Sequence, residues 1–391
     1  MNEVIFIFIF LLPVAWYFGY RHGKTKEVGK STGRQSGLSK TYFTGLNYLL
    51  NEESDKAIDT FVSMLEVDSE TVETHLALGN LFRKRGEVDR AIRIHQNLIA
   101  RPSLTPEDRK FALLELGYDY MGAGLLDRAE NIFKELSNDF THKNASLSQL
   151  LIIYQQTKDW QQAISTAGKL DYPMVENTKN EISHFYCELA EESLVNNAYR
   201  DSLGYIKKAF QADNQCVRAT LISAQIHYSK ERYKQSIKSI RDLIKQDVAF
   251  LPEAIDLATQ CYSKLNDQRG LLNFLHEAIN HGGGISAILA YADILQSQQG
   301  DKKAAEYIAS QMNQHPSIRG LLKLIGLHLE HASEGAKPSL YLLENVVTKL
   351  LENKPIYHCD NCGFDSKTLF WQCPSCKTWG GVKPIQGIEG E

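Results

Sequence analysis

The sequence is poor in proline and has little net charge. Ten prolines in 391 residues predict long helices joined by short connections, because proline disrupts the interior of a helix. A formal net charge of −4 gives the chain no overall electrostatic reason to bind nucleic acid. A mean hydropathy of −0.31 excludes a membrane protein with many spans. A chain of this length has more residues than a single hydrophobic core usually organises, so we expect a second domain or a repeat array.

Common motifs of enzyme chemistry are also missing from the sequence. It contains no phosphate-binding G-x-x-x-x-G-K-[ST], no nucleophile motif G-x-S-x-G and no zinc-protease motif H-E-x-x-H. Most histidines are scattered along the chain, where they indicate packing or surface positions. The sequence therefore predicts a protein that is not an enzyme.

One long apolar run stands at the start of the chain. Residues 4–20 contain no charged side chain, which is the short end of a helix that crosses a bilayer. Aromatic residues close the run and basic residues follow it: Trp16, Tyr17 and Tyr20, then Arg21, Lys24, Lys26 and Lys30. A cleaved secretory signal would have its basic residues before the apolar run, whereas here they follow it. A buried N-terminal helix is the other alternative. We expect residues 1–21 to form a single inner-membrane anchor, 22–37 a flexible basic linker, and the rest to be cytoplasmic.

Small residues recur with a period of 34 positions, interrupted by two insertions, through the middle of the chain. Gly45 and Gly79 are one such pair, and a second small residue follows twelve positions later, at Ala57 and Ala91. Later pairs with this twelve-residue offset are Gly117 with Ala129, Ala224 with Ser236, Ala258 with Gly270, and Ala292 with Ala304. The pattern resembles the tetratricopeptide repeat. It predicts an all-α superhelical solenoid over residues 38–353, with about nine helical hairpins and a concave face for protein partners.

Five cations lie close together in the second repeat. They are Arg83, Lys84, Arg85, Arg90 and Arg93. One interpretation is a hydrated helix face and turn. The other is a partner-binding contact, for an acidic protein segment or for lipid headgroups.

The C-terminal residues 354–391 contain four cysteines in two C-x-x-C pairs. Cys359 and Cys362 form the first pair, and Cys373 and Cys376 form the second. Each pair can turn both sulfurs toward one ion, so together they predict a tetrahedral site for one metal ion. Zinc suits a closed structural site of this kind better than iron, which would support rubredoxin-like electron transfer.

A metal module this small cannot bury all of its aromatic side chains. Those residues are Phe364, Phe370, Trp371 and Trp379. We expect some of them to dock on the last solenoid hairpin, which would make the module a fixed cap. The remaining cysteines, Cys187, Cys216 and Cys261, are predicted to be separate, small, buried groups.

An N-terminal anchor, a tetratricopeptide array and a terminal four-cysteine module together resemble the lipopolysaccharide assembly protein B family, and the resemblance is most specific in three stretches. They are residues 78–99 (LGNLFRKRGEVDRAIRIHQNLI), residues 182–190 (ISHFYCELA), and the C-D-N-C-G-F and W-Q-C-P-S-C motifs. The resemblance implies a rubredoxin-like terminal module and an inner-membrane regulator of lipopolysaccharide synthesis. It also implies an adaptor for the membrane-anchored AAA+ protease FtsH that promotes degradation of the lipid A pathway deacetylase.

Two other functions stay open at the level of sequence. One is electron transfer by an iron-loaded module. The other is a scaffold for lipopolysaccharide transport proteins without a role in proteolysis. The sequence also leaves open whether the chain forms a homodimer and whether it senses lipopolysaccharide itself.

Overall fold

The structure is a computed structural model that describes residues 72–102 and 104–391, with scattered positions between 43 and 60. The predicted anchor at 1–21 and linker at 22–37 lie outside the described residues. Within the described part of the chain, no helix combines the length and apolar character needed to cross a membrane. The chain divides into two compact units, Met1–Asp108 and Arg109–Glu391.

The first unit contains a helical hairpin made of α4 (Val72–Lys84) and α5 (Val88–Ile99). A Cβ atom on Gly79 would lie 2.3 Å from Nε2 of His95, so a larger residue would separate the two helices. Ala91, twelve positions after Gly79, is fully buried. The small residues of the predicted repeat are therefore the points where the two helices approach most closely.

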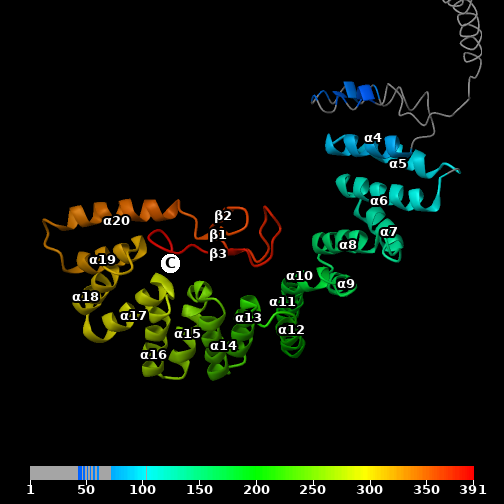
Figure 1. Cartoon of the computed structure of the whole chain (residues 1–391). Helices are drawn as coiled ribbons and strands as arrows, with labels where there is room; N and C mark the ends of the chain where they lie inside the picture. Colours follow the sequence, from blue (N-terminus) through cyan, green and yellow to red (C-terminus); the bar gives the residue numbers. More distant parts are fainter. Residues whose placement is uncertain are drawn as a thin grey trace, which may run out of the picture. The chain divides into compact units, whose positions relative to one another are not determined.

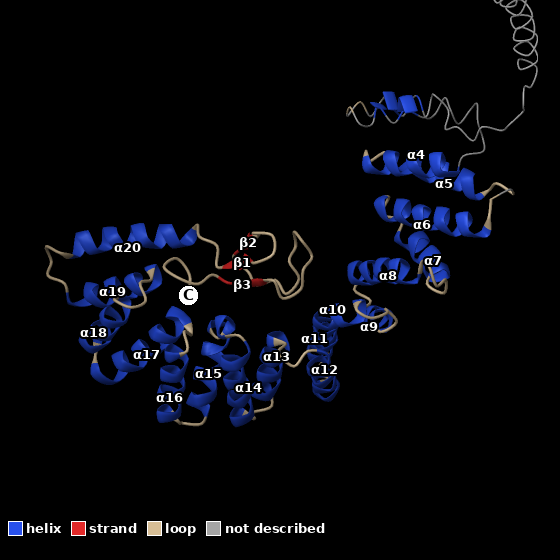
Figure 2. Cartoon of the chain, viewed as in Figure 1, coloured by secondary structure: helices blue, strands red, loops and turns tan. Residues whose placement is uncertain are grey.

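Helical hairpins continue through the second unit (Figures 1 and 2). Consecutive helices pack against each other, for example α11 with α12 and α13 with α14. The helices are α6 (Pro106–Gly122), α7 (Leu126–Leu136), α8 (Lys143–Thr157), α9 (Trp160–Ala167), α10 (Met174–Asn177), α11 (Lys179–Val195), α12 (Tyr199–Ala212), α13 (Val217–Ser229), α14 (Tyr233–Gln246), the 3-10 turn η1 (Val248–Phe250), α15 (Pro252–Lys264), α16 (Gln268–Asn280), α17 (Gly284–Gln299), α18 (Asp301–Met312), α19 (Ile318–His331) and α20 (Lys337–Glu352). The predicted tetratricopeptide-type helical array is observed over these residues, and the start of the predicted range, 38–71, lies mostly outside the described residues.

Two hairpins use the small second residue for a hydrogen bond. The hydroxyl of Ser202 donates to the carbonyl oxygen of Ala190 over 2.7 Å. The hydroxyl of Ser236 donates to the carbonyl oxygen of Ala224 over 2.8 Å. Both serines are fully buried, so these bonds satisfy a polar group that would otherwise be costly in the core. The twelve-residue offset read from the sequence thus joins the two helices of each hairpin.

Most turns inside the described hairpins share one backbone feature. Seven of them contain a residue with a positive φ, in the left-handed region, whereas the turn between α19 and α20 contains none. Glycine supplies it in three turns and other residues supply it in four: Gly86, Gly124 and Gly300, then Lys158, Asn197, Glu231 and Asn266. Glycine therefore marks fewer than half of these described turns in the sequence.

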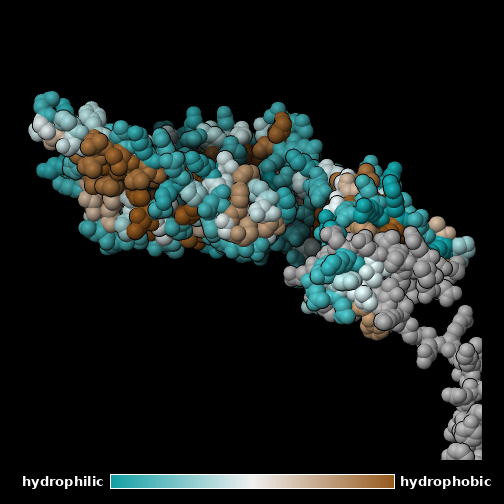
Figure 3. Space-filling model, turned by 90° about the horizontal axis from the view of Figure 1, so that it is seen from above, coloured by the Kyte–Doolittle hydropathy of each residue, from teal (hydrophilic) through white to brown (hydrophobic). Residues whose placement is uncertain are grey.

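The last helix, α20, has an apolar outer face. Five of its side chains are between 47% and 65% exposed: Tyr341, Leu342, Leu343, Val346 and Leu350. Figure 3 shows a brown, hydrophobic patch at the α20 end of the second unit, where the leucines and the valine of this face lie. The terminal repeat of a solenoid commonly presents a polar outer face to water, so α20 departs from that pattern.

The C-terminal module is a small antiparallel sheet. Its strands are β1 (Tyr357–Cys359), β2 (Asp365–Ser366) and β3 (Val382–Pro384), in the order β2-β1-β3. His358 lies opposite Asp365 on one side and opposite Lys383 on the other. Within the second unit the sheet lies between α20 and the helices α13–α17 (Figure 1). The fold is therefore a helical solenoid with a metal ribbon placed against it.

Candidate metal centre and its docking face

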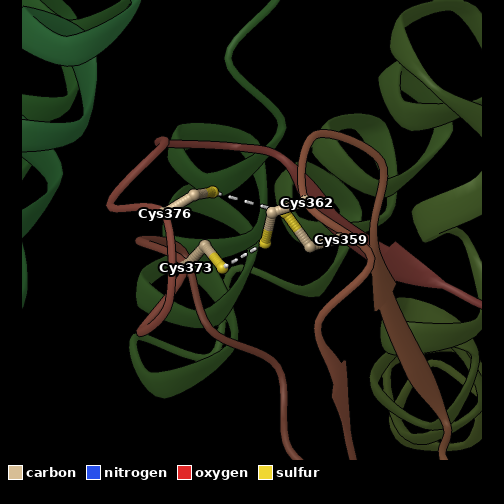
Figure 4. A group of neighbouring side chains, drawn as sticks. All are labelled: Cys359, Cys362, Cys373 and Cys376. Carbon is tan, nitrogen blue, oxygen red and sulfur yellow. Dashed lines mark hydrogen bonds between the residues drawn. The ribbon is translucent and has the colours of Figure 1, made fainter. Parts of the chain in front are cut away.

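Four cysteine thiols converge at two turns of the module (Figure 4). The Sγ atoms of Cys359 and Cys376 are 3.8 Å apart, and those of Cys362 and Cys373 are 3.7 Å apart. All four Sγ atoms lie within 4.8 Å of one another. Four thiolates around a tetrahedral ion at ~2.3 Å would stand ~3.8 Å apart. The four residues predicted as ligands are thus brought together in an arrangement that fits one metal ion, zinc or iron.

Each pair of cysteines lies on a tight turn that ends in a left-handed residue. The amide of Gly363 donates to the carbonyl oxygen of Cys359, and the amide of Lys377 donates to that of Cys373, both over 2.9 Å. Gly363 has a φ of 76°, and Lys377 has a φ of 63°. Glycine adopts this conformation without strain, whereas a residue with a Cβ pays about 1 kcal/mol. No feature of the sequence marks Lys377 for this role.

The thiols occupy different environments. Burial raises the pKa of the Cys359 thiol to about 11. Hydrogen bonding to Asn361 and Thr378 lowers the pKa of the Cys376 thiol to about 5. Cys359 and Cys373 are buried, whereas Cys362 is exposed. Because a metal binds the thiolate form, protons compete with the ion, and metal affinity falls in acid.

Trp379 anchors one end of the module on the solenoid. Its Nε1 donates to Oε1 of Gln155 in α8 over 2.9 Å. Its ring stands edge-on to Trp160 and to Phe185, with centroids 6.0 Å and 5.7 Å away. The ring also stacks on His184, with centroids 5.2 Å apart. The indole is therefore buried among aromatic rings while its polar N–H is satisfied, which is the arrangement that a buried tryptophan needs.

Trp371 forms a second anchor. Its ring stacks on Phe250 at 5.6 Å, and the guanidinium of Arg218 lies 5.7 Å from its centroid. Arg218 is only 3% exposed, and it pairs with Glu188 at 2.8 Å and with Glu191 at 2.7 Å. The two carboxylates hold the buried cation in place, so its face is available to the indole ring.

His184 lies between the two tryptophans. Its ring centroid is 6.0 Å from that of Trp371 and 5.2 Å from that of Trp379. Burial, with a smaller contribution from the charge of Arg218, lowers the pKa of His184 to about 3. The imidazole is therefore neutral near pH 7 and acts as a packing group in the interface.

Polar contacts hold the strands of the module. The hydroxyl of Tyr357 donates to Oε1 of Glu253 over 2.7 Å, and Nζ of Lys383 lies 3.0 Å from Oδ2 of Asp247. Burial, followed by the bond to Glu253, raises the pKa of Tyr357. The phenol therefore stays protonated and donates throughout the physiological range.

The solenoid residues beneath the module recur with the repeat. His184, Arg218, Glu253, Ser286 and Arg319 follow one another at intervals of 33 to 35 residues. They lie on α11, α13, α15, α17 and α19, the first helices of successive hairpins. We call these five residues the inner row. Because equivalent positions of successive repeats line the same face, the module covers the face that the solenoid offers to a ligand.

The docking position differs from the predicted one. Trp371 and Trp379 do dock on the solenoid, but they contact helices from α8 onward and not the last hairpin. Phe364 and Phe370 contact each other, with centroids 6.3 Å apart. Phe370 is 38% exposed. The module is therefore not an end cap, because the chain turns back after α20 and lays the sheet along the inner row.

The predicted partner-binding cations surround the turn between α4 and α5. Lys84, Arg85, Arg90 and Arg93 are exposed, and Arg83 is half-buried. The carboxylate of Glu87 lies 3.5 Å from Arg85 and 2.7 Å from Arg90, so it offsets part of the positive charge. A role for this cluster in partner binding stays a prediction.

Two of the three remaining cysteines lie together. The Sγ atoms of Cys187 and Cys216 are 3.9 Å apart in the core between α11 and α13. Burial raises the pKa of Cys187, and hydrogen bonding, chiefly from Cys187, lowers the pKa of Cys216 to about 7. The prediction that these two thiols are separate was therefore wrong. Their sequence spacing of 29 residues carries no signal of the contact.

Proteins of known name match the chain along its full length. It is 40% identical over 391 residues to lipopolysaccharide assembly protein B of Escherichia coli strain K12, with 100% of both chains covered. It is 34% identical over 403 residues to the protein of the same name from Haemophilus influenzae, again with 100% of both chains covered. The chain belongs to the lipopolysaccharide assembly protein B family. The family predicted from three motifs is thus confirmed.

Family models agree with the two parts of the fold. A rubredoxin metal binding domain matches residues 357–384, which contain all four cysteines. A tetratricopeptide repeat matches residues 74–110. Among solved structures, a tetratricopeptide repeat protein from Parabacteroides merdae is 11% identical to this member of the lipopolysaccharide assembly protein B family. It covers 79% of this chain and 98% of its own, with a TM-score of 0.30.

Proposed function

We propose that the protein is a non-enzymatic adaptor of the inner membrane that regulates lipopolysaccharide synthesis. In this role it presents the lipid A pathway deacetylase to the protease FtsH and so promotes its degradation. The proposal takes the assembly role from the name of the relatives that match at full length. A tetratricopeptide array supports an adaptor, because such arrays bind partner proteins through extended surfaces.

One observation carries the proposal furthest. The metal module lies on the inner row of the solenoid and is attached by the buried Trp379 and the half-buried Trp371. Electron transfer is the alternative for a four-cysteine module. In that alternative a redox partner would have to approach the metal, yet two of its four ligands, Cys359 and Cys373, are fully buried. A module attached over most of the second unit has a role in shaping the partner-binding surface.

The metal in this proposal is zinc. Zinc has no redox chemistry and forms closed tetrahedral thiolate sites that supply folding free energy. Cys359, Cys362, Cys373 and Cys376 would hold the ion. The chain's own contribution is to place these thiols on two tight turns and to attach the module to α8, α11, α13 and α15.

The membrane location is also part of the proposal. The apolar run at 4–20 would hold the adaptor in the membrane that contains FtsH, and the basic residues after it would keep the solenoid in the cytoplasm. Confinement to one membrane raises the effective concentration of adaptor and protease for each other.

The test is the half-life of the deacetylase after translation is blocked. Five strains are compared: wild type, a deletion, Cys373→Ser/Cys376→Ser, Trp379→Ala and, as the matched control, Phe370→Ala. Immunoblots confirm equal levels of each variant. We expect rapid decay with wild type and Phe370→Ala, and slow decay in the other strains. Equal decay in wild type and the deletion would contradict the adaptor function and favour a scaffold role.

A further inference from the structure

The segment after β3 folds back and places the side chain of Glu391 on the solenoid. Its Oε2 accepts from the amide of Ser286 over 3.0 Å, and its Oε1 accepts from the hydroxyl of Ser286 over 2.8 Å. Arg319 forms an ion pair with the same carboxylate. The side chain of Glu391 is only 7% exposed. One carboxylate is thus bound by an amide, a hydroxyl and a guanidinium.

The site around this carboxylate is built from three separate features. Ser286 is the third residue of α17, where backbone amides lack partners inside the helix and carry partial positive charge. Gly284 has a φ of 76°, and a Cβ there would lie 2.9 Å from Cβ of Glu391. Arg319, near the start of α19, supplies a full positive charge. A glycine that leaves room for the ligand, a backbone amide without a partner inside its helix and an arginine together recognise a carboxylate.

The position of the site is that of a ligand site on the solenoid. Ser286 and Arg319 are the last two members of the inner row, 33 residues apart. The other three, His184, Arg218 and Glu253, contact the metal module. Residues 385–391 therefore extend along the row beyond the module and cover the part that the sheet leaves.

The segment is held by bonds within itself and by bonds to the rest of the chain. The amide of Gly387 donates to the backbone oxygen of Glu391, and the amide of Glu391 donates to that of Ile385, both over 2.7 Å. Toward the solenoid, the carbonyl of Ile388 accepts from the amide of Ile318 over 2.9 Å. The side chain of Ile388 is 57% exposed. For the segment to leave the site as a unit, the bonds of Glu391, the bond of Ile388 and the ion pair of Glu389 with Lys354 at 2.8 Å must break.

Space for a longer ligand lies on both sides of Glu391. A cavity of about 260 Å³ is lined by Ile285, Ile288 and Glu391 itself among others. A second cavity of about 560 Å³ is lined by Pro252, Leu289 and Arg319 among others. Both combine aliphatic side chains with the carboxylate-binding groups.

We propose that Gly284, Ser286 and Arg319 form a binding site for an acidic peptide segment of a partner protein. Glu391 occupies the site as an internal ligand, and a partner must displace it. The preferred ligand carries a glutamate next to small and aliphatic residues, as the internal segment does. The site requires neither the protease nor the deacetylase, so it goes beyond the adaptor function.

The test measures binding in trans to the purified full-length protein. The probe is a fluorescent, C-terminally amidated peptide with the sequence of residues 385–391, IQGIEGE, followed by anisotropy. We expect Glu391→Gln to bind the probe about tenfold more tightly than wild type, because the internal ligand reduces the fraction of competent sites. Adding Arg319→Gln should abolish this gain. Adding Lys323→Gln, on the same helix but paired with Asp293, should preserve it.

A competition experiment distinguishes a site for acidic peptides in general from a contact that only the chain's own segment 385–391 can make. A second amidated peptide, GGIGGE, differs in sequence from the probe but keeps one glutamate. It should displace the probe from Glu391→Gln, and the peptide GGIGGQ, with glutamine in place of that glutamate, should not. Displacement by IQGIEGE alone, or equal binding of the probe by wild type and Glu391→Gln, would overturn the proposal. Circular dichroism and metal content confirm that each variant is folded. Because neither FtsH nor the deacetylase is present, a negative result leaves the adaptor function standing.

Discussion

The indole N–H of Trp379 donates a hydrogen bond to the amide oxygen of Gln155, which lies 224 positions earlier in the chain. The same oxygen also accepts from the side chain of Gln372 over 3.0 Å. One glutamine of α8 thus satisfies two donors of the metal module. This contact ties the last strand region of the chain to the third helical pair of the described residues.

Loss of Trp379 should destabilise the attachment of the module. We expect Trp379→Ala to lower the free energy of unfolding by about 3 kcal/mol, because removing a buried tryptophan leaves a cavity and removes a hydrogen bond. Phe370→Ala, on the same module but 38% exposed, should cost less than about 1 kcal/mol. Urea unfolding followed by circular dichroism measures both. Similar losses for the two variants would show that docking adds little stability.

Metal removal should expose the two tryptophans. The module is too small to fold on its own core, so the ion supplies much of its folding free energy. Chelation should therefore shift the emission of Trp371 and Trp379 to longer wavelength while most solenoid helicity remains. Cys373→Ser/Cys376→Ser should give the same emission without chelator. Unchanged emission on complete metal loss would contradict a metal-dependent fold of the module.

The metal content itself distinguishes the two candidate ions. We expect one zinc ion for each chain and a colourless protein. Elemental analysis of protein purified without added metal provides the measurement. Stoichiometric iron with visible absorption that bleaches on reduction would support electron transfer instead.

His184 should make stability depend on pH. The unfolded chain protonates this histidine below its ordinary pKa of about 6.5, whereas the folded protein leaves it neutral down to about pH 3. Protons therefore favour the unfolded state in this range, and stability falls as pH falls. Between pH 7.5 and 5.5 the loss from this group should be about 1.4 kcal/mol.

Comparison of variants isolates this contribution. Unfolding free energies of wild type and His184→Gln are measured at both pH values, and the difference in their pH dependence is attributed to His184. His276→Gln, at an exposed position of α16, serves as the control. A pH dependence that His184→Gln leaves unchanged would show that the imidazole titrates normally in the folded protein.

Arg218 should be needed for the docking face as well as for charge balance. Arg218→Ala leaves Glu188 and Glu191 without their buried partner, which typically costs about 3 kcal/mol, and it uncovers one face of Trp371. Arg218→Lys keeps the charge but loses the forked contact, so we expect an intermediate loss. Arg200→Ala, exposed at the start of α12, is the control. Melting temperatures would order the variants, and equal values for all three would contradict this role.

Local patterns in the sequence predicted the repeat and the metal ligands. The spacing of small residues such as Gly79 and Ala91 is set by helix contacts inside one hairpin, so it can be read along the chain. The C-x-x-C pairs are equally local, because each pair belongs to one turn. Gly363 follows Cys362 directly, so its place in the first turn is also a local feature.

Long-range contacts could not be read from the sequence. The position of Trp379 against Gln155 depends on how far the solenoid bends and where the chain returns after α20, and no local pattern encodes either. The approach of Cys187 to Cys216 has the same origin. Left-handed turn residues such as Lys158 and Glu231 were also missed, because surrounding helices and not their own preferences impose the conformation.

The docked module changes how the solenoid reaches its final state. In a plain repeat array each repeat needs only its neighbours, so the part made first can settle while later repeats are still being synthesised. Here Gln155 of α8 cannot form its contact with Trp379 until that residue has been synthesised. Trp379 follows about 224 residues later, which takes roughly 10–45 s at ordinary rates of synthesis. During that interval Trp160 and Phe185 can stack on each other but lack the edge-on contact with Trp379. The repeat that contains α8 therefore completes its packing only after the metal module has been synthesised.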